Sequence, residues 1–254
     1  MKGVINKKPF GSPMSRPRVA LSWSSGKDSA WTLHRLRQDP GIEVAALVTT
    51  VNSEFNRVAM HAVRQELLHA QAEAAGLPLI EAPIPYPCSN AEYESRMRAL
   101  IERLRGERIE RMAFGDLYLA DVRAYREQQL QGTGIAPLFP LWNEPTAALA
   151  RSMIAGGLRA VLTCVDPKQL APAFCGRHFD AALLDTLPTG VDPCGENGEF
   201  HSFACAGPMF RAPIAVEVGE TVERDGFVFT DLRRKRASSD DIADTARNGF
   251  PSQF

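Results

Sequence analysis

Short apolar runs alternate with amphipathic stretches over the first half of the chain. Apolar runs bounded by turn residues predict buried strands, and apolar residues spaced three and four apart predict helices. Strands are expected at residues 19–23, 44–51, 77–80 and 111–114. Helices are expected at residues 29–38, 60–75, 89–106 and 122–131. This alternation predicts an α/β fold with a doubly wound parallel sheet, in which ligands bind at the carboxyl ends of the strands.

The alternation stops at the proline-rich stretch Pro137–Trp142, and a smaller region with a different pattern follows. Its predicted elements are a helix at residues 146–155 and strands at residues 158–165, 214–218 and 227–231. The Asp225-Gly226 pair is a hairpin-turn signal ahead of the last strand. We therefore expect a smaller C-terminal α/β lobe beside the parallel sheet.

These patterns divide the chain into two structured parts. We expect one domain over residues 17–138 and a second lobe over residues 139–235. Residues 1–16 and 236–254 show no hydrophobic period and are rich in turn-forming and polar types, so both are predicted to be flexible tails.

Net charge, apolar runs and cysteine spacing argue against several classes of partner and site. The 254 residues carry 29 basic and 30 acidic side chains, a formal net charge of -1, which makes nucleic acid an unlikely partner. The sequence shows neither a signal peptide nor a run of about 18 apolar residues, so no membrane association is expected. The five cysteines form no C-x-x-C pair. They are interpreted as reduced thiols of a cytoplasmic protein without a zinc or iron–sulfur centre.

Candidate chemistry begins at the loop Ser24-Ser25-Gly26-Lys27-Asp28-Ser29, here called the phosphate loop, between the first predicted strand and helix. A helix start presents backbone N–H groups at the positive end of the helix dipole, where phosphates bind. Serine hydroxyls add donors, Gly26 permits close approach, and Lys27 supplies a positive charge. The alternative is an ordinary Ser/Gly turn in which Asp28 or Ser29 caps the helix.

The phosphate loop is not a Walker A motif, because the first glycine of that motif is missing and Asp28 follows Lys27. It resembles the S-G-G-x-D-S loop of the ATP-pyrophosphatase superfamily, or adenine nucleotide alpha-hydrolases. Over residues 19–232 the chain resembles the diphthine–ammonia ligase family, especially its shorter bacterial-type members. The stretches that carry the resemblance are Ser22–Ser29, Phe114–Leu117, Pro140–Trp142, Cys164–Pro167 and Asp192–His201.

The resemblance implies a HUP-like ATP-binding PP-loop domain over residues 17–138 and a substrate-binding lobe over residues 139–235. It also implies an ATP-dependent ligase that adenylates a carboxylate, releases pyrophosphate and AMP, and uses ammonia or an amine as acceptor. The carboxylate is either a small molecule or borne by a protein, and Mg²⁺ accompanies the ATP. Nucleotide binding is assigned to Ser22, Ser24, Ser25, Gly26, Lys27, Asp28, Ser29, Gly115 and Asp116.

A second candidate cluster lies in the segment Cys194–His201, which packs Glu196, Glu199 and His201 around two glycines. Together with Lys27, these three are the predicted catalytic residues, because carboxylates and imidazole can bind a cation or move a proton. Asp116 and Glu199 are the predicted metal ligands. The alternatives are a solvated acidic turn for the cluster and a turn-capping role for Asp116.

Two rival functions keep the same nucleotide site. A nucleotide-binding sensor or hydrolase would hold ATP without ligase chemistry, and the carboxylate–histidine cluster argues against that reading. A tRNA base-modifying PP-loop enzyme is the second rival, and the neutral net charge argues against it. A homodimer is the expected assembly.

Overall fold

The computed structural model describes residues 16–52, 57–58, 63–85 and 87–235. The flexible tails predicted at residues 1–16 and 236–254 lie outside the described residues, except for Arg16.

The first sheet is built mainly from parallel strands. Its strands are β1 (Arg18–Ser22), β2 (Glu43–Asn52), β3 (Arg57–Val58), β4 (Leu79–Ile84), β5 (Arg111–Ala113) and β6 (Ala136–Leu138). Five of them run parallel in the order β4–β2–β1–β5–β6, and β3 pairs antiparallel with the end of β2. Strands β2 and β4 were added on one side of β1, and β5 and β6 on the other. The order of the strands thus reverses next to β1, and the loop that follows β1 lies at this switch point.

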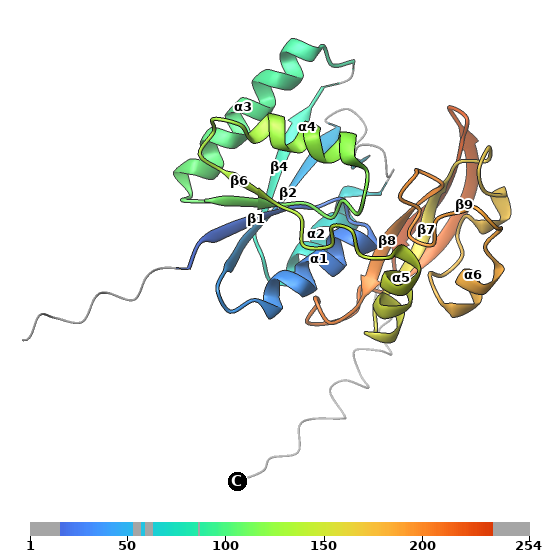
Figure 1. Cartoon of the computed structure of the whole chain (residues 1–254). Helices are drawn as coiled ribbons and strands as arrows, with labels where there is room; N and C mark the ends of the chain where they lie inside the picture. Colours follow the sequence, from blue (N-terminus) through green and yellow to red (C-terminus); the bar gives the residue numbers. More distant parts are fainter. Residues whose placement is uncertain (1–15, 53–56, 59–62, 86, 236–254) are drawn as a thin grey trace, which may run out of the picture.

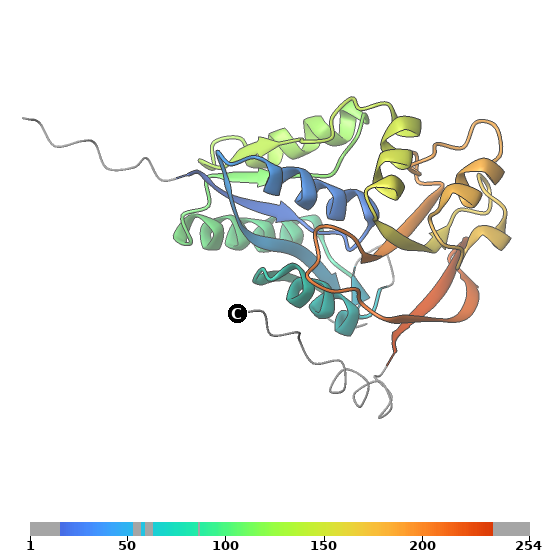
Figure 2. The ribbon, with the colours of Figure 1, turned by 90° about the horizontal axis from the view of Figure 1, so that it is seen from below.

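Helices cover both faces of this sheet (Figures 1 and 2). They are α1 (Lys27–Gln38), α2 (Gln65–Ala75), α3 (Asn90–Gly106) and α4 (Ala120–Leu130). On one face, Leu104 of α3 and Leu130 of α4 pack with Met112 of β5 in a separate apolar cluster. On the other face, α1 and α2 belong to the larger core. The predicted doubly wound arrangement is therefore confirmed.

The second sheet is antiparallel, with the strand order β8–β7–β10–β9. Its strands are β7 (Arg159–Val165), β8 (Phe200–Ala206), β9 (Val216–Arg224) and β10 (Phe227–Arg234). The associated helices are α5 (Thr146–Ala155), α6 (Ala181–Thr186) and the 3₁₀ turn η1 (Pro172–Phe174). This arrangement confirms the expected smaller C-terminal α/β lobe.

The two sheets share one hydrophobic core. Leu33 of α1 and Leu67 of α2 belong to the same buried cluster as Val161 of β7 and Phe203 of β8. Arg64, which precedes α2, forms two hydrogen bonds of 3.0 and 2.7 Å with the Asp231 carboxylate of β10. The α1/α2 layer is thus packed directly against the second sheet, and β8 comes next to the phosphate loop.

Some element boundaries differ from the sequence prediction. The helix predicted from residue 60 begins at Gln65, while residues 60–62 lie outside the described part of the chain. Strand β8 was not predicted, because it is buried on both faces and so lacks the alternation of a half-buried strand. Strand β9 runs well past the predicted end at residue 218, because its charged, exposed residues hide the strand pattern.

Candidate active site

The phosphate loop lies at the carboxyl end of β1 and leads directly into α1, as predicted. Helix α1 begins at Lys27 rather than Ser29, and Gly26 is its N-cap without a side-chain capping bond. Lys27 and Asp28 therefore belong to the first turn of the helix. This turn carries the positive end of the helix dipole and points toward the carboxyl edge of the parallel sheet.

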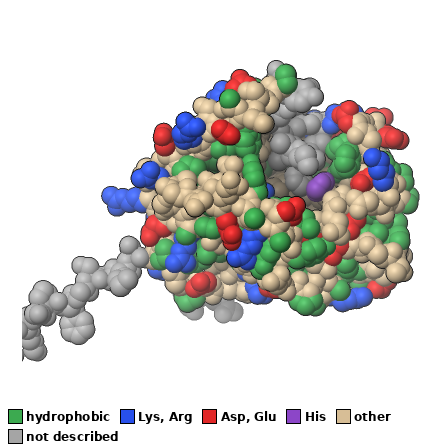
Figure 3. All heavy atoms as spheres, turned by 45° about the horizontal axis from the view of Figure 1, so that its top comes forward, with side chains coloured by type: hydrophobic (Ala, Val, Ile, Leu, Met, Phe, Trp, Pro, Cys, Tyr) green, Lys and Arg blue, Asp and Glu red, His purple; other side chains and the backbone are tan. Residues whose placement is uncertain are grey.

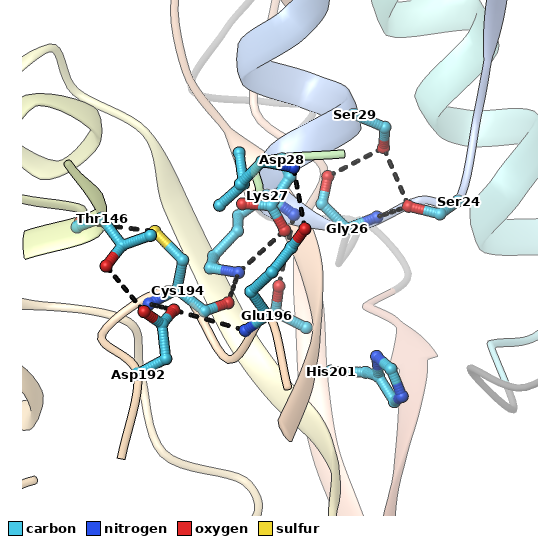
Figure 4. Close-up of polar contacts among 12 residues, drawn as sticks. Ser24, Gly26, Lys27, Asp28, Ser29, Thr146, Asp192, Cys194, Glu196 and His201 are labelled. Atoms are coloured by element: carbon cyan, nitrogen blue, oxygen red, sulfur yellow. Dashed lines mark hydrogen bonds and ion pairs between the residues drawn. The ribbon is translucent and has the colours of Figure 1, made fainter. Parts of the chain in front are cut away.

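Two serine hydroxyls hold the loop in shape (Figure 4). Ser24 Oγ accepts a hydrogen bond of 3.3 Å from the Gly26 N–H and lies 3.1 Å from Ser29 Oγ. Ser29 Oγ donates to the Gly26 carbonyl at 3.0 Å. The loop is thus organised by its own side chains, and the two hydroxyls remain beside the carboxyl end of β1.

Ser25 has a strained backbone conformation. Its φ is 69°, in the left-handed region where glycine is favoured, and its side chain is fully buried. Ser25 Oγ has no hydrogen-bond partner among the described residues. The sequence predicts the loop serines as hydroxyl donors, and Ser25 Oγ does not donate to any neighbouring group of the described residues.

Replacing Ser25 by glycine is expected to stabilise the protein. The change removes the steric cost of a side chain at positive φ and a buried, unpaired hydroxyl, which together predict a gain of about 1 kcal/mol. This corresponds to a rise in Tm of ~2–4 °C, measured by thermal unfolding. Arg108→Gly, at an exposed residue with φ 58°, is the matched control for backbone strain away from the site. An unchanged or lower Tm in Ser25→Gly would contradict the strain argument.

Lys27 is buried and turns toward the second lobe. Its Nζ donates to Asp28 Oδ2 at 2.8 Å and to the Cys194 carbonyl, and only 2% of the residue is exposed. The ammonium also lies 5.6 Å from the centre of the Phe179 ring and 5.2 Å from that of Phe200. Burial is the largest single influence and would lower the pKa of Lys27, but the attraction of Asp28, the hydrogen bond to it and the charges of Cys194 and Glu196 together outweigh burial and raise the pKa. Lys27 is therefore a buried cation that joins α1 to the loop containing Cys194.

Residues 192–199 form a loop braced by two carboxylates. Glu199 accepts hydrogen bonds from the Asp192 and Asn197 N–H groups, both at 2.9 Å, and from the Asn197 side chain at 3.0 Å. Asp192 accepts from the Cys194 N–H at 2.8 Å and from Thr146 Oγ1 at 2.6 Å. Both oxygens of Glu199 are thus engaged in holding the loop. This placement favours a bracing role over the predicted metal-ligand role.

Glu196 is the carboxylate that this loop presents to the phosphate loop (Figure 4). Its Oε1 accepts a 2.8 Å hydrogen bond from the Leu117 N–H. Burial raises the pKa of Glu196 to about 7, and Asp28 adds to the rise while Lys27 opposes it. A carboxyl group with a pKa close to neutral can accept and release a proton under physiological conditions.

Gly115 and Asp116 come directly after β5 and pack against the start of α1. A side chain at Gly115 would lie 3.1 Å from the backbone of Asp28 and Ser29, so glycine allows this close approach. Asp116 Oδ2 lies 3.7 Å from Arg126 Nε, which is too long for a hydrogen bond. Burial is the main cause that raises the pKa of Asp116, and Asp28 contributes to it.

The carboxylates of Asp28, in the phosphate loop, and of Asp116, next to it, have oxygens that could bind Mg²⁺. Asp28 Oδ1 and Asp116 Oδ2 are both buried without a hydrogen-bond partner among the described residues. Such hard oxygens suit Mg²⁺, which usually takes one or two protein carboxylates together with phosphate oxygens. Across the described part of the chain, no three His, Cys, Asp or Glu side chains are grouped to hold a metal ion by themselves.

A cavity of about 820 Å³ opens next to the phosphate loop. Ser22 and Ser24 line it at the end of β1, residues 48–50 at the end of β2, and His201 from β8. Side chains of α3 and α4 form the opposite wall. Figure 3 shows the molecule hollowed on this side, with hydrophobic side chains along part of the rim. The cavity thus begins at the predicted nucleotide loop and follows the carboxyl edge of the sheet.

His201 lies apart from Glu196 (Figure 4). Burial lowers the pKa of His201 to about 4, and the charge of Lys27 adds to this effect. The imidazole is therefore neutral at pH 7 and does not supply a positive charge to a phosphate. The three residues of the predicted cluster thus have different surroundings: Glu199 braces the loop, Glu196 faces Lys27, and His201 lines the cavity.

Acid should destabilise the protein through His201. In the unfolded chain its pKa is 6.5, so between pH 6.5 and about 4 the unfolded state binds more protons, and stability falls as pH falls. The contribution has a limiting slope of about 1.4 kcal/mol per pH unit. His201→Gln removes it, so the Tm of this variant relative to wild type should increase as the pH is lowered from 7 to 4.5. A difference that stays constant with pH would contradict the low pKa.

The parallel sheet, the phosphate loop after β1 and the antiparallel second lobe together define the class of protein, a two-lobed α/β protein with a PP-loop. The chain belongs to the diphthamide synthase family: the model of the diphthamide synthase N-terminal domain matches residues 17–137, and that of the C-terminal domain matches residues 145–237. The family predicted from the five sequence stretches is thereby confirmed.

Curated relatives with the name diphthine–ammonia ligase cover nearly the same extent. The protein from Mus musculus is 26% identical over 246 residues, which are 87% of this chain and 91% of the relative. That from Rattus norvegicus is 27% identical over 247 residues, with the same two coverages of 87% and 91%. That from Homo sapiens is 26% identical over 231 residues, 81% of this chain and 85% of the relative. The chain is thus a member of a family of ligases.

Proposed function

We propose that this chain is an ATP-dependent amide ligase that activates a carboxylate by adenylation and transfers the acyl group to ammonia or an amine. The observation that carries the proposal is the position of the phosphate loop. It lies at the switch point of the sheet, opens on the cavity and faces Glu196 of the loop of residues 192–199. An anion site and a neutral-pH proton acceptor are thus adjacent, as the two half-reactions require.

ATP would bind with its pyrophosphate part at the phosphate loop. The first turn of α1 offers backbone N–H groups and the positive end of the helix dipole, and Ser24 and Ser29 add hydroxyls. Ser22, Gly115 and Asp116 complete the nucleotide surroundings at the ends of β1 and β5. Lys27 contributes through its charge from behind the helix start, since its ammonium is bound to Cys194 and Asp28.

In the first half-reaction, an oxygen of the substrate carboxylate attacks the α-phosphorus and the bond to the pyrophosphate oxygen breaks. In the second, the nitrogen of ammonia attacks the acyl carbon and AMP leaves with the bridging oxygen. The attacking nitrogen must lose a proton, and the proposed acceptor is Glu196, whose pKa of about 7 suits this role. The names of the relatives favour a carboxylate of the diphthine type, borne by a protein, with ammonia as the nitrogen source.

Asp28 and Asp116 are the residues that would hold Mg²⁺ together with the phosphates, because each has a buried carboxylate oxygen without a hydrogen-bond partner among the described residues. When bound, Mg²⁺ neutralises negative charge on the phosphate oxygens. Glu199 remains a less suitable ligand, since its oxygens accept hydrogen bonds from the loop.

We further propose a cytoplasmic homodimer that acts without a membrane or nucleic acid. All five cysteines are free thiols. No helix in the described residues has the length and apolar character needed to cross a membrane.

The products of ATP test this function. The protein is incubated with Mg²⁺, ammonium, ATP labelled on the α-phosphate and a cell extract that supplies candidate carboxylates, and AMP is then separated from ADP. The proposal predicts AMP and pyrophosphate in amounts that depend on the extract. Formation of ADP and phosphate would contradict adenylation, and bound ATP without any product would favour a nucleotide sensor.

A further inference from the structure

Gln71 is a polar residue in the middle of the apolar side of α2. It is completely buried, and its helix neighbours Leu67 and Leu68 are equally buried in the core. Burying a primary amide is costly unless its hydrogen-bonding groups find partners. A buried glutamine at this position therefore needs hydrogen-bond partners, and the structure provides them.

The Gln71 amide makes three hydrogen bonds inside the core. Its Oε1 accepts from the indole Nε1 of Trp23 at 2.9 Å. Its Nε2 donates to the Ser25 carbonyl at 2.9 Å and to the Ala204 carbonyl at 2.7 Å. Indole N–H is only a donor and a carbonyl is only an acceptor, so the chemistry fixes which end of the amide is which. Both N–H groups of the amide are used.

These bonds converge on the strained residue of the phosphate loop. The Ser25 carbonyl accepts a second hydrogen bond of 2.9 Å, from the Ala204 N–H of β8. Two donors from two different elements thus fix the peptide that joins Ser25 to Gly26, at a residue with φ 69°. The orientation of this peptide also sets the Gly26 N–H, which is bound to Ser24 Oγ.

We propose that Gln71 is a positioning residue for nucleotide binding: it holds Ser25 in the left-handed conformation and ties the phosphate loop to β8. The inference rests on the proposed function in that the loop binds the phosphates of ATP. Gln71 itself lies behind the loop and does not touch the nucleotide. Without Gln71, the Ser25 carbonyl keeps only the Ala204 N–H as donor, and the bond from Gln71 to the Ala204 carbonyl is lost as well. The Ser25 peptide is then held less firmly in the strained conformation, and the N–H groups that follow lose their alignment.

The test measures the Kd for ATP by equilibrium dialysis with the full-length protein and Mg²⁺. Gln71→Met keeps the length of the side chain and removes its hydrogen bonds, and it is expected to raise the Kd at least tenfold. Leu68→Val, a small core change in the same helix, is the control: it lowers Tm and leaves the Kd within twofold. If Gln71→Met does not fold, Gln71→Asn, which stays polar but is one methylene too short to reach both carbonyls, takes its place with the same expectation.

Rescue distinguishes positioning from simple packing. In a Ser25→Gly background the left-handed conformation carries no side-chain cost, so Gln71→Met should raise the Kd by less than threefold. An unchanged Kd in Gln71→Met, or an equal loss in both backgrounds, would overturn the inference. A wild-type protein that binds ATP but forms no AMP would refute the ligase function and leave this test intact. A wild-type protein that does not bind ATP would refute both.

Discussion

Glu196→Gln is expected to lower the rate of AMP formation about a hundredfold or more without lowering the stability of the folded protein. The rate falls because an amide cannot accept the proton of the attacking nitrogen, and general-base catalysis contributes about 10²–10⁴-fold. The fold is retained because the amide oxygen of glutamine can still accept the Leu117 N–H. The rate is measured with labelled ATP at saturating ammonium, and the stability by thermal unfolding at pH 8.

The stability of Glu196→Gln relative to wild type should depend on pH. The ordinary pKa of Glu196 is 4.5 and the folded value is about 7, so in that window the folded state binds more protons than the unfolded state. Its contribution to stability therefore decreases as pH rises from 4.5 to 7, and Glu196→Gln should gain in Tm relative to wild type over the same range. Glu223→Gln, the same change at an exposed glutamate of β9 outside the site, is the control. An equal rate in Glu196→Gln would remove this residue from the reaction.

Lys27→Met is expected to destabilise the protein by about 3 kcal/mol, because it leaves the Asp28 carboxylate and the Cys194 carbonyl without their cation in a buried place. For a protein of this size the expected decrease in Tm is ~6–12 °C. ATP turnover should also fall, since the positive charge behind the start of α1 is lost.

Lys168→Met is the matched control, because Lys168 is exposed and its side chain lies outside the site. It should change neither Tm nor turnover. If Lys27→Met keeps the stability of the wild type and loses only turnover, Lys27 acts on the nucleotide directly and the buried contacts with the second lobe are not important for folding. If both remain unchanged, the phosphate loop is not part of the mechanism.

The sequence was sufficient to place the phosphate loop. A buried strand, a Ser/Gly turn and an amphipathic helix are local patterns, and the structure brings β1, residues 24–29 and α1 together in that order. The parallel sheet could also be predicted, because the residue pattern of each strand and helix is local. Only the start of α1 differed, since Lys27 and Asp28 are polar and look like loop residues.

The contacts behind the loop could not be predicted, because they join residues far apart in the chain. Ser202 Oγ accepts the Lys27 N–H at 3.2 Å, and the strand that carries it shows no alternating pattern. Gln71 offered one signal, a polar residue four positions after Leu67 on the apolar side of a predicted helix. That signal indicates a buried partner without saying which one.

Residue type also could not separate the roles within the second cluster. Glu196 and Glu199 are three residues apart on one loop, yet the first faces Lys27 and the second accepts hydrogen bonds from the loop itself. His201 is neutral because β8 buries it, which depends on the packing of the second lobe. The catalytic and metal-binding assignments of these residues stay predictions that the variants above can test.

The central claim is that a carboxylate attacks the α-phosphorus of ATP and releases pyrophosphate before the nitrogen enters. Exchange of labelled pyrophosphate into ATP measures this step directly, with ammonium withheld and the carboxylate substrate supplied in an extract or as a diphthine-bearing protein. The account predicts exchange that requires the carboxylate and is lost in Ser24→Ala/Ser29→Ala, which removes two of the three hydroxyls of the phosphate loop. ATP consumption that yields ADP and phosphate, with no exchange of pyrophosphate at any concentration of substrate, would contradict it.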